Sequence, residues 1–501
     1  MKKKLTLIVA IIPFIYGCNS DEYIEDPLKE NQWYLNEFNK YGLVSHINLN
    51  NKEYKGRGVV VSVVDNGLDL NHEDLVNNIG DLNYSYLSKN YDFNNSDHGT
   101  SCAGIIAGEE GNGIGITGIA PQAQIVGFNA LRAPSVSNLA DALIRNKGDV
   151  WVSNNSWGDF NSWGEPLRLR SLLKGALNEG TKNGRHGKGI IYIFSAGNGA
   201  AEEYGLPTDN VNYSGLVNNR YTIPVCAVDE KAKRATYSEV GATLVVCAPS
   251  KGRREGLGIT TTDVSGEEGY NPKVFPNDIE NNNYTDNFSG TSASAPMVSG
   301  VAALMLEANP ELGWRDVKAI LAKSARIIDK EHPDWSTNGA HININHSYGF
   351  GMVDADKAID LSQNWRNYPE EVIIKKELQV DKLIPDDETS SITEYIDIEE
   401  EMIVEFVDIY FDAPDHSRLG DLEIILTSPF GTKSVLAEQH RESFEGFFRY
   451  KNWRFGSIRH LEENSKGRWN LTIKDKSSSK SGTFKSWGLT IYGHNSNPLR
   501  L

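Results

Sequence analysis

The sequence contains little cysteine, less positive than negative charge, and no long apolar run beyond its N-terminus. Its 501 residues include 4 cysteines, too few for a disulfide scaffold. Lys and Arg number 50 against 67 Asp and Glu, and the net charge of -17 argues against a nucleic-acid partner. Internal repeats are not evident. The hydrophobic content of 39% is nevertheless enough to bury the cores of two or three domains.

The N-terminus, MKKKLTLIVAIIPFIYGC, has a basic start, a short apolar core and a small residue before Cys18. This pattern predicts a secretory signal over residues 1–17, because the apolar core is too short for a comfortable membrane span. Residues 15–18 resemble a bacterial lipobox, which implies lipidation of Cys18 and a membrane-anchored protein facing the periplasm or the cell surface. The alternative is an ordinary cleaved signal. Residues 18–25 are acidic and would form a tether.

The stretch NFSGTSASAPMVSGVAALMLEA, residues 287–308, predicts a small-residue turn followed by a helix. Ser292 is expected in the first turn, where free backbone N–H groups and the positive end of the helix dipole converge. A serine there becomes a nucleophile if a base and an orienting acid reach it. The GxSxG turn of nucleophile-elbow hydrolases is absent around Ser292, which excludes that class.

An acid and a base precede this serine in the chain. Asp65 ends the apolar run GVVVSVV and is followed by the turn signal Asn66-Gly67, which places it at the carboxyl end of a buried strand. His98 lies just ahead of a small-residue helix. Either residue alone is more often a cap or a satisfied polar group. The order Asp65, His98, Ser292 is, however, the order of the subtilisin triad.

The segments DNGLDLNHEDL, HGTSCAG and GTSASAP resemble the three catalytic segments of the subtilisin-like serine proteases. The kexin and furin branch is indicated by SNNSWG, FSAGNG, LEANPELGWRDV and HSYGFGMVDA, and the resemblance runs from about Asp26 to the C-terminus. It implies a triad of Asp65, His98 and Ser292, with Asn198 in the oxyanion hole. The enzyme would be a calcium-dependent serine endopeptidase acting on proteins or peptides, and a monomer is expected.

Strand-like runs alternate with helical stretches from Gly58 to Leu361, which predicts an α/β fold with a doubly wound, mostly parallel sheet in a catalytic domain over 26–361. The runs are GVVVSVVD, AQIVGFNAL, VWVSNNSW, GIIYIFSAGN, YTIPVCAVD and LVVCAPS. Residues 362–371 are expected to form a linker. Short strands over 372–498 predict an all-β sandwich, which resembles the jelly-roll P domain of kexin-like proteases. Such a domain would stabilise the catalytic domain, and the alternative is independent carbohydrate or partner binding.

The resemblance also implies structural calcium. Asp26 and Asp74 match carboxylates of a calcium site, and Asn112 with the carbonyls of Glu109, Ile114 and Ile116 would complete it, since Ca²⁺ prefers such oxygen ligands. Without the resemblance, these acids would be interpreted as merely solvated. Glu239 matches one carboxylate of a second site near the substrate pocket.

The substrate pocket departs from the dibasic-cleaving pattern. The turn Ser156-Trp157-Gly158 is retained, and Asp159 follows it. Asn161 and Ser214, however, stand where dibasic-cleaving members have aspartates, and Asn66 and Asn95 replace acids that favour a second basic residue. A Lys or Arg side chain loses charge partners in such a pocket, so strict Lys-Arg cleavage is not expected.

The remaining cysteines and the N-terminal length raise two further expectations. Cys226 and Cys247 lie in strand-like runs and are expected to be buried and reduced. Cys102, one turn from His98, stands at a position that the kexin branch also fills with cysteine, and this resemblance implies sensitivity to mercurials rather than a catalytic role. The sequence that matches the mature enzyme begins within a few residues of Cys18, which leaves no space for a propeptide of ordinary size. The alternative function is a catalytically idle, protease-derived surface binding protein.

Overall fold

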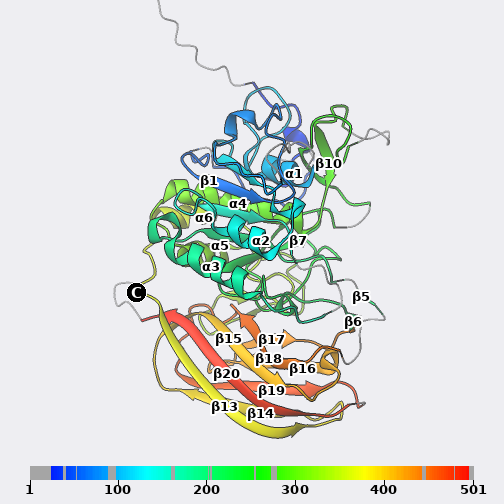
Figure 1. The fold of residues 1–501 in the computed structure, drawn as a ribbon, viewed down its shortest axis with the longest axis vertical. Coiled ribbons are helices and arrows are strands. Elements are labelled where there is room, and N and C mark those ends of the chain that lie inside the picture. Colours follow the sequence, from blue (N-terminus) through cyan, green and yellow to red (C-terminus); the bar gives the residue numbers. More distant parts are fainter. Residues whose placement is uncertain are drawn as a thin grey trace, which may run out of the picture.

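The computed structural model describes two domains (Figure 1), an α/β domain followed by an all-β sandwich. The described residues are 24–37, 41–51, 53–87, 97–158, 164–200, 202–203, 206–252, 255–271, 279–442, 447–478 and 480–495. The predicted signal, Cys18, Asn95, Asp159 and Asn161 therefore lie outside them. Within these ranges, no helix combines the length and the hydropathy that crossing a bilayer requires.

The described part of the first domain contains a six-stranded sheet in the order β2-β1-β3-β4-β7-β8, with every neighbouring pair parallel. Its strands are β1 (Val60–Val64), β2 (Gln124–Phe128), β3 (Val152–Asn155), β4 (Ile191–Ser195), β7 (Thr222–Val228) and β8 (Val246–Pro249). Each of the six predicted strand-like runs contains one of them. They are buried almost throughout because helices cover both faces of the sheet.

Two hydrophobic cores lie on opposite faces of this sheet. Side chains of α1 (Asp97–Ala107), α4 (Thr291–Ala308), α5 (Trp314–Ser324) and α6 (Ala355–Gln363) belong to one core. Those of α2 (Val136–Ile144) and α3 (Ser171–Asn183) belong to the other. The predicted doubly wound α/β fold is confirmed.

Short elements complete this domain. The small strands pair as β5 (Glu202–Glu203) with β6 (Leu206–Pro207), β9 (Ile259–Thr262) with β10 (Tyr284–Phe288), and β11 (Ser336–Thr337) with β12 (Asn343–Ile344). The 3₁₀ helices are η1 (Lys29–Asn31), η2 (Val76–Asn78), η3 (Ala130–Arg132), η4 (Gly184–Gly187) and η5 (Val211–Tyr213).

The described residues of the second domain form two antiparallel four-stranded sheets, which confirms the predicted sandwich. One sheet consists of β13 (Val372–Ile384), β20 (Gly482–His494), β15 (Ile403–Ala413) and β18 (Tyr450–Ser457). The other consists of β14 (Ile392–Ile398), β19 (Gly467–Asp475), β16 (Leu422–Thr427) and β17 (Lys433–Ala437), with η6 (Leu419–Asp421) before β16. Strands β14 and β18 were not predicted, because polar residues interrupt their apolar pattern.

The segment predicted as a linker is packed against the α/β domain. The Trp365 Nε1 group and the Tyr368 backbone N–H donate to the same Asp316 carboxylate oxygen at 2.9 and 2.7 Å. Glu371 forms an ion pair with Arg220. Residues 362–371 therefore contact the α/β domain at several points along their length.

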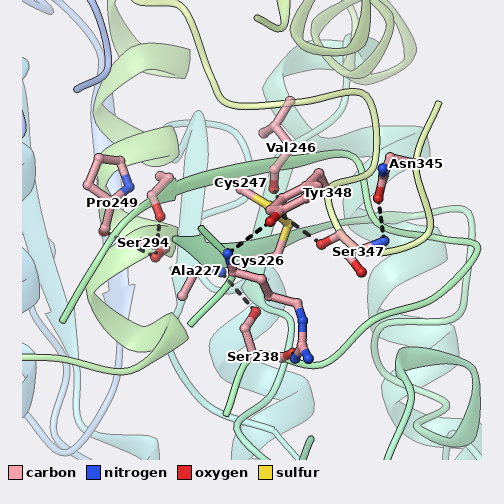
Figure 2. The surroundings of a disulfide bond; sticks show 12 residues. Cys226, Ala227, Ser238, Val246, Cys247, Pro249, Ser294, Asn345, Ser347 and Tyr348 are labelled. Atoms are coloured by element: carbon pink, nitrogen blue, oxygen red, sulfur yellow. Dashed lines mark hydrogen bonds between the residues drawn. A yellow bond between two sulfur atoms is a disulfide. The ribbon is translucent and has the colours of Figure 1, made fainter. Parts of the chain in front are cut away.

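Cys226 and Cys247 form a disulfide (Figure 2), so the expectation that both are reduced was wrong. The two residues lie directly opposite each other on β7 and β8. The two cysteines are 21 residues apart in the sequence, and their pairing depends on the register of the two strands, which the sequence pattern does not specify. Cys102 is a buried free cysteine in the described part of the chain.

Candidate active site

Three strands of the parallel sheet end at the same edge and present polar residues there. Asp65 directly follows β1, Ser156 directly follows β3, and Asn198 lies three residues beyond β4. The carboxyl ends of parallel strands meet at one edge, where α/β sheets place their sites. Together with His98 and Ser292, these residues line one pocket of about 420 Å³.

Asp65 and His98 form a close pair. The His98 Nδ1 atom lies 2.9 Å from both carboxylate oxygens of Asp65, and Asp65 is almost fully buried. Burial alone lowers the pKa of His98, but the charge and hydrogen bond of the Asp65 carboxylate, together with a smaller effect of Asp97, raise the pKa above its ordinary value. Gly99 permits this approach, since a Cβ there would lie 1.9 Å from the Gly67 carbonyl oxygen.

Ser292 is the second residue of α4, as its expected place in the first helical turn required. Its hydroxyl donates to the Ser156 carbonyl oxygen at 3.3 Å, and the Ser156 hydroxyl donates to the Ser292 carbonyl oxygen at 3.0 Å. The Cys102 thiol lies 3.7 Å from that same Ser292 carbonyl oxygen. Because Ser292 is in the first turn, its backbone N–H has no partner four residues earlier within the helix.

Asn198 is oriented by the residue before the serine. Its Oδ1 atom accepts hydrogen bonds from the Thr291 N–H and the Thr291 hydroxyl, both at 2.9 Å. The Nδ2 group is therefore the part of the amide that can donate to a bound group. Glu239 supports the same turn, because its carboxylate accepts from the Gly199 N–H at 3.1 Å.

The pocket wall contains most of the predicted substrate-binding residues. Ser156, Trp157, Gly158 and Ser214 line it, together with Asn66 and Glu239. Asp209 and Val217 also line the pocket, although they were not predicted from the sequence. Asp209 could have been considered from the sequence, because it is an acid only five residues before the predicted pocket residue Ser214.

Most of the residues predicted to bind calcium lie together and outside the lining of this pocket. Asp26 and Asp74 are buried, and within the described ranges neither belongs to an ion pair. Asp74 accepts from Asn112 Nδ2 at 3.0 Å and from the Ile116 N–H at 2.9 Å. Asp26 accepts from the Gly111 N–H at 2.9 Å. Burial raises the pKa of Asp74 to about 8.

Hydrogen bonds donated by backbone N–H groups bring two other predicted ligands, Glu109 and Ile114, into the same region. The Glu109 N–H donates to the Asp74 carbonyl oxygen at 2.9 Å, and the Asn112 Oδ1 atom accepts from the Ile114 N–H at 2.8 Å. The structure thus gathers the loop 109–116 around the two buried acids. Glu239 is not part of this group and lies in the substrate pocket with Asp209.

Comparison with known proteins relates both domains to described families. Residues 56–351 match the Subtilase family, and residues 409–491 match the proprotein convertase P-domain. The chain is 32% identical over 95% of its length to a dibasic-processing endoprotease of Schizosaccharomyces pombe and to human proprotein convertase subtilisin/kexin type 6. It spans 66% and 49% of these two relatives.

A solved structure resembles the whole described chain. The serine protease of Aeromonas sobria superposes with a TM-score of 0.82 at 26% identity, covering 94% of this chain and 96% of that one. The likeness therefore extends over both domains.

Proposed function

The chain belongs to the subtilase family, and we propose from this premise that it is a serine endopeptidase. The observation that carries the proposal is the convergence of four groups in one pocket: the Asp65–His98 pair, Ser292 at the start of α4, and the Asn198 amide. Each group is of the type that acyl transfer requires at that place.

The first step is attack by the Ser292 hydroxyl on the scissile carbonyl carbon. His98 accepts the hydroxyl proton at Nε2, because Nδ1 faces the Asp65 carboxylate at 2.9 Å and carries its own proton toward it. Asp65 holds this tautomer and stabilises the imidazolium that forms. The raised pKa of His98 follows from the same carboxylate and strengthens His98 as a base.

The negative charge then develops on the former carbonyl oxygen. The Asn198 Nδ2 group and the Ser292 backbone N–H are placed to donate to it. His98 next gives its proton to the leaving amine, which leaves an acyl group on Ser292. Water activated by His98 hydrolyses this acyl-enzyme and restores the serine.

For selectivity, we propose that the enzyme favours a basic residue before the cut without requiring one. The acid Asp209 lines the pocket, which favours a cation, whereas Ser214 replaces an expected acid. The name of the Schizosaccharomyces pombe relative, a dibasic-processing endoprotease, supports a basic preference.

We also propose that calcium binds at Asp26, Asp74, Asn112 and the carbonyl oxygens of Glu109, Ile114 and Ile116. Two buried carboxylates in one loop region are costly unless a cation compensates their charge, and all these donors are oxygen atoms. Calcium there would fix the loop 109–116 against the N-terminal segment. Glu239 is assigned to a second calcium site beside the pocket.

For location, we propose export and lipid anchoring through Cys18. The Cys226–Cys247 disulfide supports export, because disulfides persist mainly in oxidising compartments. Globomycin treatment of expressing bacteria, which blocks lipoprotein signal cleavage, should make the precursor accumulate, and Cys18→Ala should abolish labelling by palmitate.

The deciding experiment for the function is cleavage of a peptide mixture by the protein without residues 1–18, beside a Ser292→Ala control, with and without a calcium chelator. Turnover that disappears in the control supports the endopeptidase, and the aligned cut sites report the preferred residue. Peptides that bind but stay intact would favour the alternative, a surface binding protein.

A further inference from the structure

One short segment of the α/β domain, residues 208–218, contacts both the substrate pocket and the sandwich. Asp209, Ser214 and Val217 line the pocket. The residues that contact the sandwich are Asn210, Asn212, Tyr213 and Asn218. The two sets of residues alternate along one segment. The contacts of this segment with the sandwich therefore also determine the position of the pocket wall.

Glu438, just after β17, makes the central contact. Its two carboxylate oxygens accept from Asn210 Nδ2 at 3.0 and 2.9 Å. Asn210 is fully buried, and its Oδ1 atom accepts from the Asn212 N–H at 2.8 Å, which caps η5. One sandwich carboxylate thereby fixes the residue that follows Asp209 and the short helix that precedes Ser214.

Glu438 also reaches a second part of the pocket wall. Its Oε2 atom lies 3.2 Å from His346 Nε2, and the His346 carbonyl oxygen accepts from the Gly241 N–H at 3.0 Å. Gly241 lies two residues beyond Glu239, which lines the pocket. The same carboxylate therefore connects the two segments that carry the pocket acids Asp209 and Glu239.

His440 supports the segment from the other side. Its Nε2 atom lies 3.1 Å from the Gly164 carbonyl oxygen, and its Nδ1 atom lies 2.9 Å from the Glu438 carbonyl oxygen and 3.1 Å from the Tyr213 hydroxyl. Both ring nitrogens are therefore within hydrogen-bond distance of oxygen atoms. The Leu167 N–H in turn donates to the Tyr213 carbonyl oxygen at 2.8 Å, so the chain near Gly164 and the pocket wall are held together.

Strand β18 adds backbone contacts. The Gly456 N–H donates to Asn212 Oδ1 at 2.8 Å, and Asn212 Nδ2 donates back to the Gly456 carbonyl oxygen at 3.2 Å. Asn218 Nδ2 donates to the Arg454 carbonyl oxygen at 2.9 Å. The Tyr213 ring is buried in the hydrophobic core of the sandwich. The pocket wall is thus anchored along its whole length.

We propose that the sandwich is a structural part of the substrate pocket, and that Glu438 is the positioning residue that places Asp209 and Ser214 and so sets selectivity for the side chain before the scissile bond. This inference rests on the proposed endopeptidase function. It makes Glu438 a determinant of KM, although Glu438 does not line the pocket itself.

The test compares two substitutions of interdomain carboxylates in the full chain. Glu438→Gln keeps the size of the side chain but places an NH₂ group against Asn210 Nδ2. The matched control is Glu405→Gln: Glu405 accepts from Arg315 Nε at 2.7 Å and from His494 Nδ1 at 2.7 Å, and it does not line the pocket. Both changes weaken the domain interface, but only the first touches the pocket wall.

For Glu438→Gln, we expect KM for the preferred peptides to rise by about 5- to 20-fold with kcat nearly unchanged, and the preference among residues before the cut to flatten. Glu405→Gln should lower Tm and leave KM within about 2-fold. Glu438→Asp, which keeps the charge, should recover part of the lost affinity. Equal KM changes in both Gln variants, or unchanged KM in Glu438→Gln, would overturn the proposal.

Amide hydrogen exchange of residues 208–218 in the whole protein gives a measure that needs no substrate. Exchange should become about tenfold faster in Glu438→Gln and stay unchanged in Glu405→Gln. If the wild type neither cleaves peptides nor reacts with an alkyl fluorophosphonate, the endopeptidase function fails, and the exchange result still decides the positioning role. Unchanged exchange in Glu438→Gln would refute that role.

Discussion

The two domains use their buried polar groups differently. In the α/β domain, parallel strands end at one edge, so Asp65, Ser156 and Asn198 converge although they are far apart in sequence. In the sandwich, antiparallel neighbours end at opposite edges, and no such convergence arises from the sheet itself. The proposed chemistry therefore uses residues of the first domain, whereas loops and one strand of the second domain contact the segment that forms the pocket wall.

The contact between the domains combines buried amides with apolar residues such as Phe406 and Leu461, which belong to a core of the α/β domain. The α/β domain contributes the side-chain amides of Asn210, Asn212 and Asn218, and each amide forms a hydrogen bond with a group of the sandwich. Such buried polar contacts fix position well because each one is costly to leave unsatisfied. The comparison predicts that substitutions in the first domain abolish the reaction, whereas those at the contact alter stability and affinity.

The largest effect is expected from removal of the nucleophile. Ser292→Ala should lower kcat by about 10⁶-fold, the magnitude known for the equivalent loss in subtilisin, with peptide binding retained. Steady-state kinetics and peptide binding by calorimetry test this. Residual turnover within about tenfold of the wild type would place the chemistry elsewhere.

A smaller but still large effect is expected from Asp65→Asn, at about 10⁴-fold in kcat, the magnitude known for this change in chymotrypsin-like proteases. The neutral His98 ring is the active form, so kcat/KM falls as the pH drops through its raised pKa. Without the Asp65 charge, burial lowers the pKa of His98. The fall of kcat/KM on the acidic side of the pH profile, its acidic limb, therefore moves to lower pH. The control Asp97→Asn should shift the limb less, since Asp97 contributes less to the His98 pKa.

Asn198→Ala should cost about 10²- to 10³-fold in kcat with little change in KM, the loss known for removing the same donor from subtilisin. The reason is that the Nδ2 group of this amide would donate to the charge that develops during the reaction rather than to the bound substrate. A pH profile with an unchanged acidic limb would separate this effect from damage to His98. A change confined to KM would contradict the role in the oxyanion hole.

Within the first domain, loss of the Cys226–Cys247 disulfide should reduce stability rather than chemistry. The double substitution to Ala should lower the free energy of unfolding by about 2 to 4 kcal/mol, measured by urea denaturation, with kcat/KM preserved after folding. The wild-type protein lacking residues 1–18, denatured without reductant, should show one reactive thiol in a titration, that of Cys102. If Cys226 and Cys247 also reacted, the disulfide would not form in the protein.

The smallest effect concerns the contact between the domains. Asn212→Ala removes both hydrogen bonds to Gly456 and should lower the free energy of unfolding by about 1 to 3 kcal/mol. Asn367→Ala serves as the exposed control, because its side chain also bonds to a backbone carbonyl oxygen, that of Glu311. If both variants lost the same free energy of unfolding, the buried hydrogen bonds between the domains would contribute no more to stability than an exposed hydrogen bond does.

Much of the fold could be predicted from local pattern. The six parallel strands were recognisable because strands buried on both faces appear as continuous β-branched runs. Strands β14 and β18 were missed because each carries polar residues on an exposed face or at the domain contact. Ser292, His98, Asp65 and Asn198 could be singled out because each follows a strand or begins a helix with distinctive small residues.

By itself, the sequence determined the order of the main strands and helices and the residue types available for acyl transfer, since these depend on neighbours in the chain. Only the tertiary structure decided that Cys226 pairs with Cys247, that Asp209 lines the pocket, and that Glu438 holds the segment beside it. These facts depend on strand register and on contacts between residues far apart in the sequence. Asn210 and Glu438, for example, are separated by 228 positions. Local periodicity carries no information about contacts at that distance.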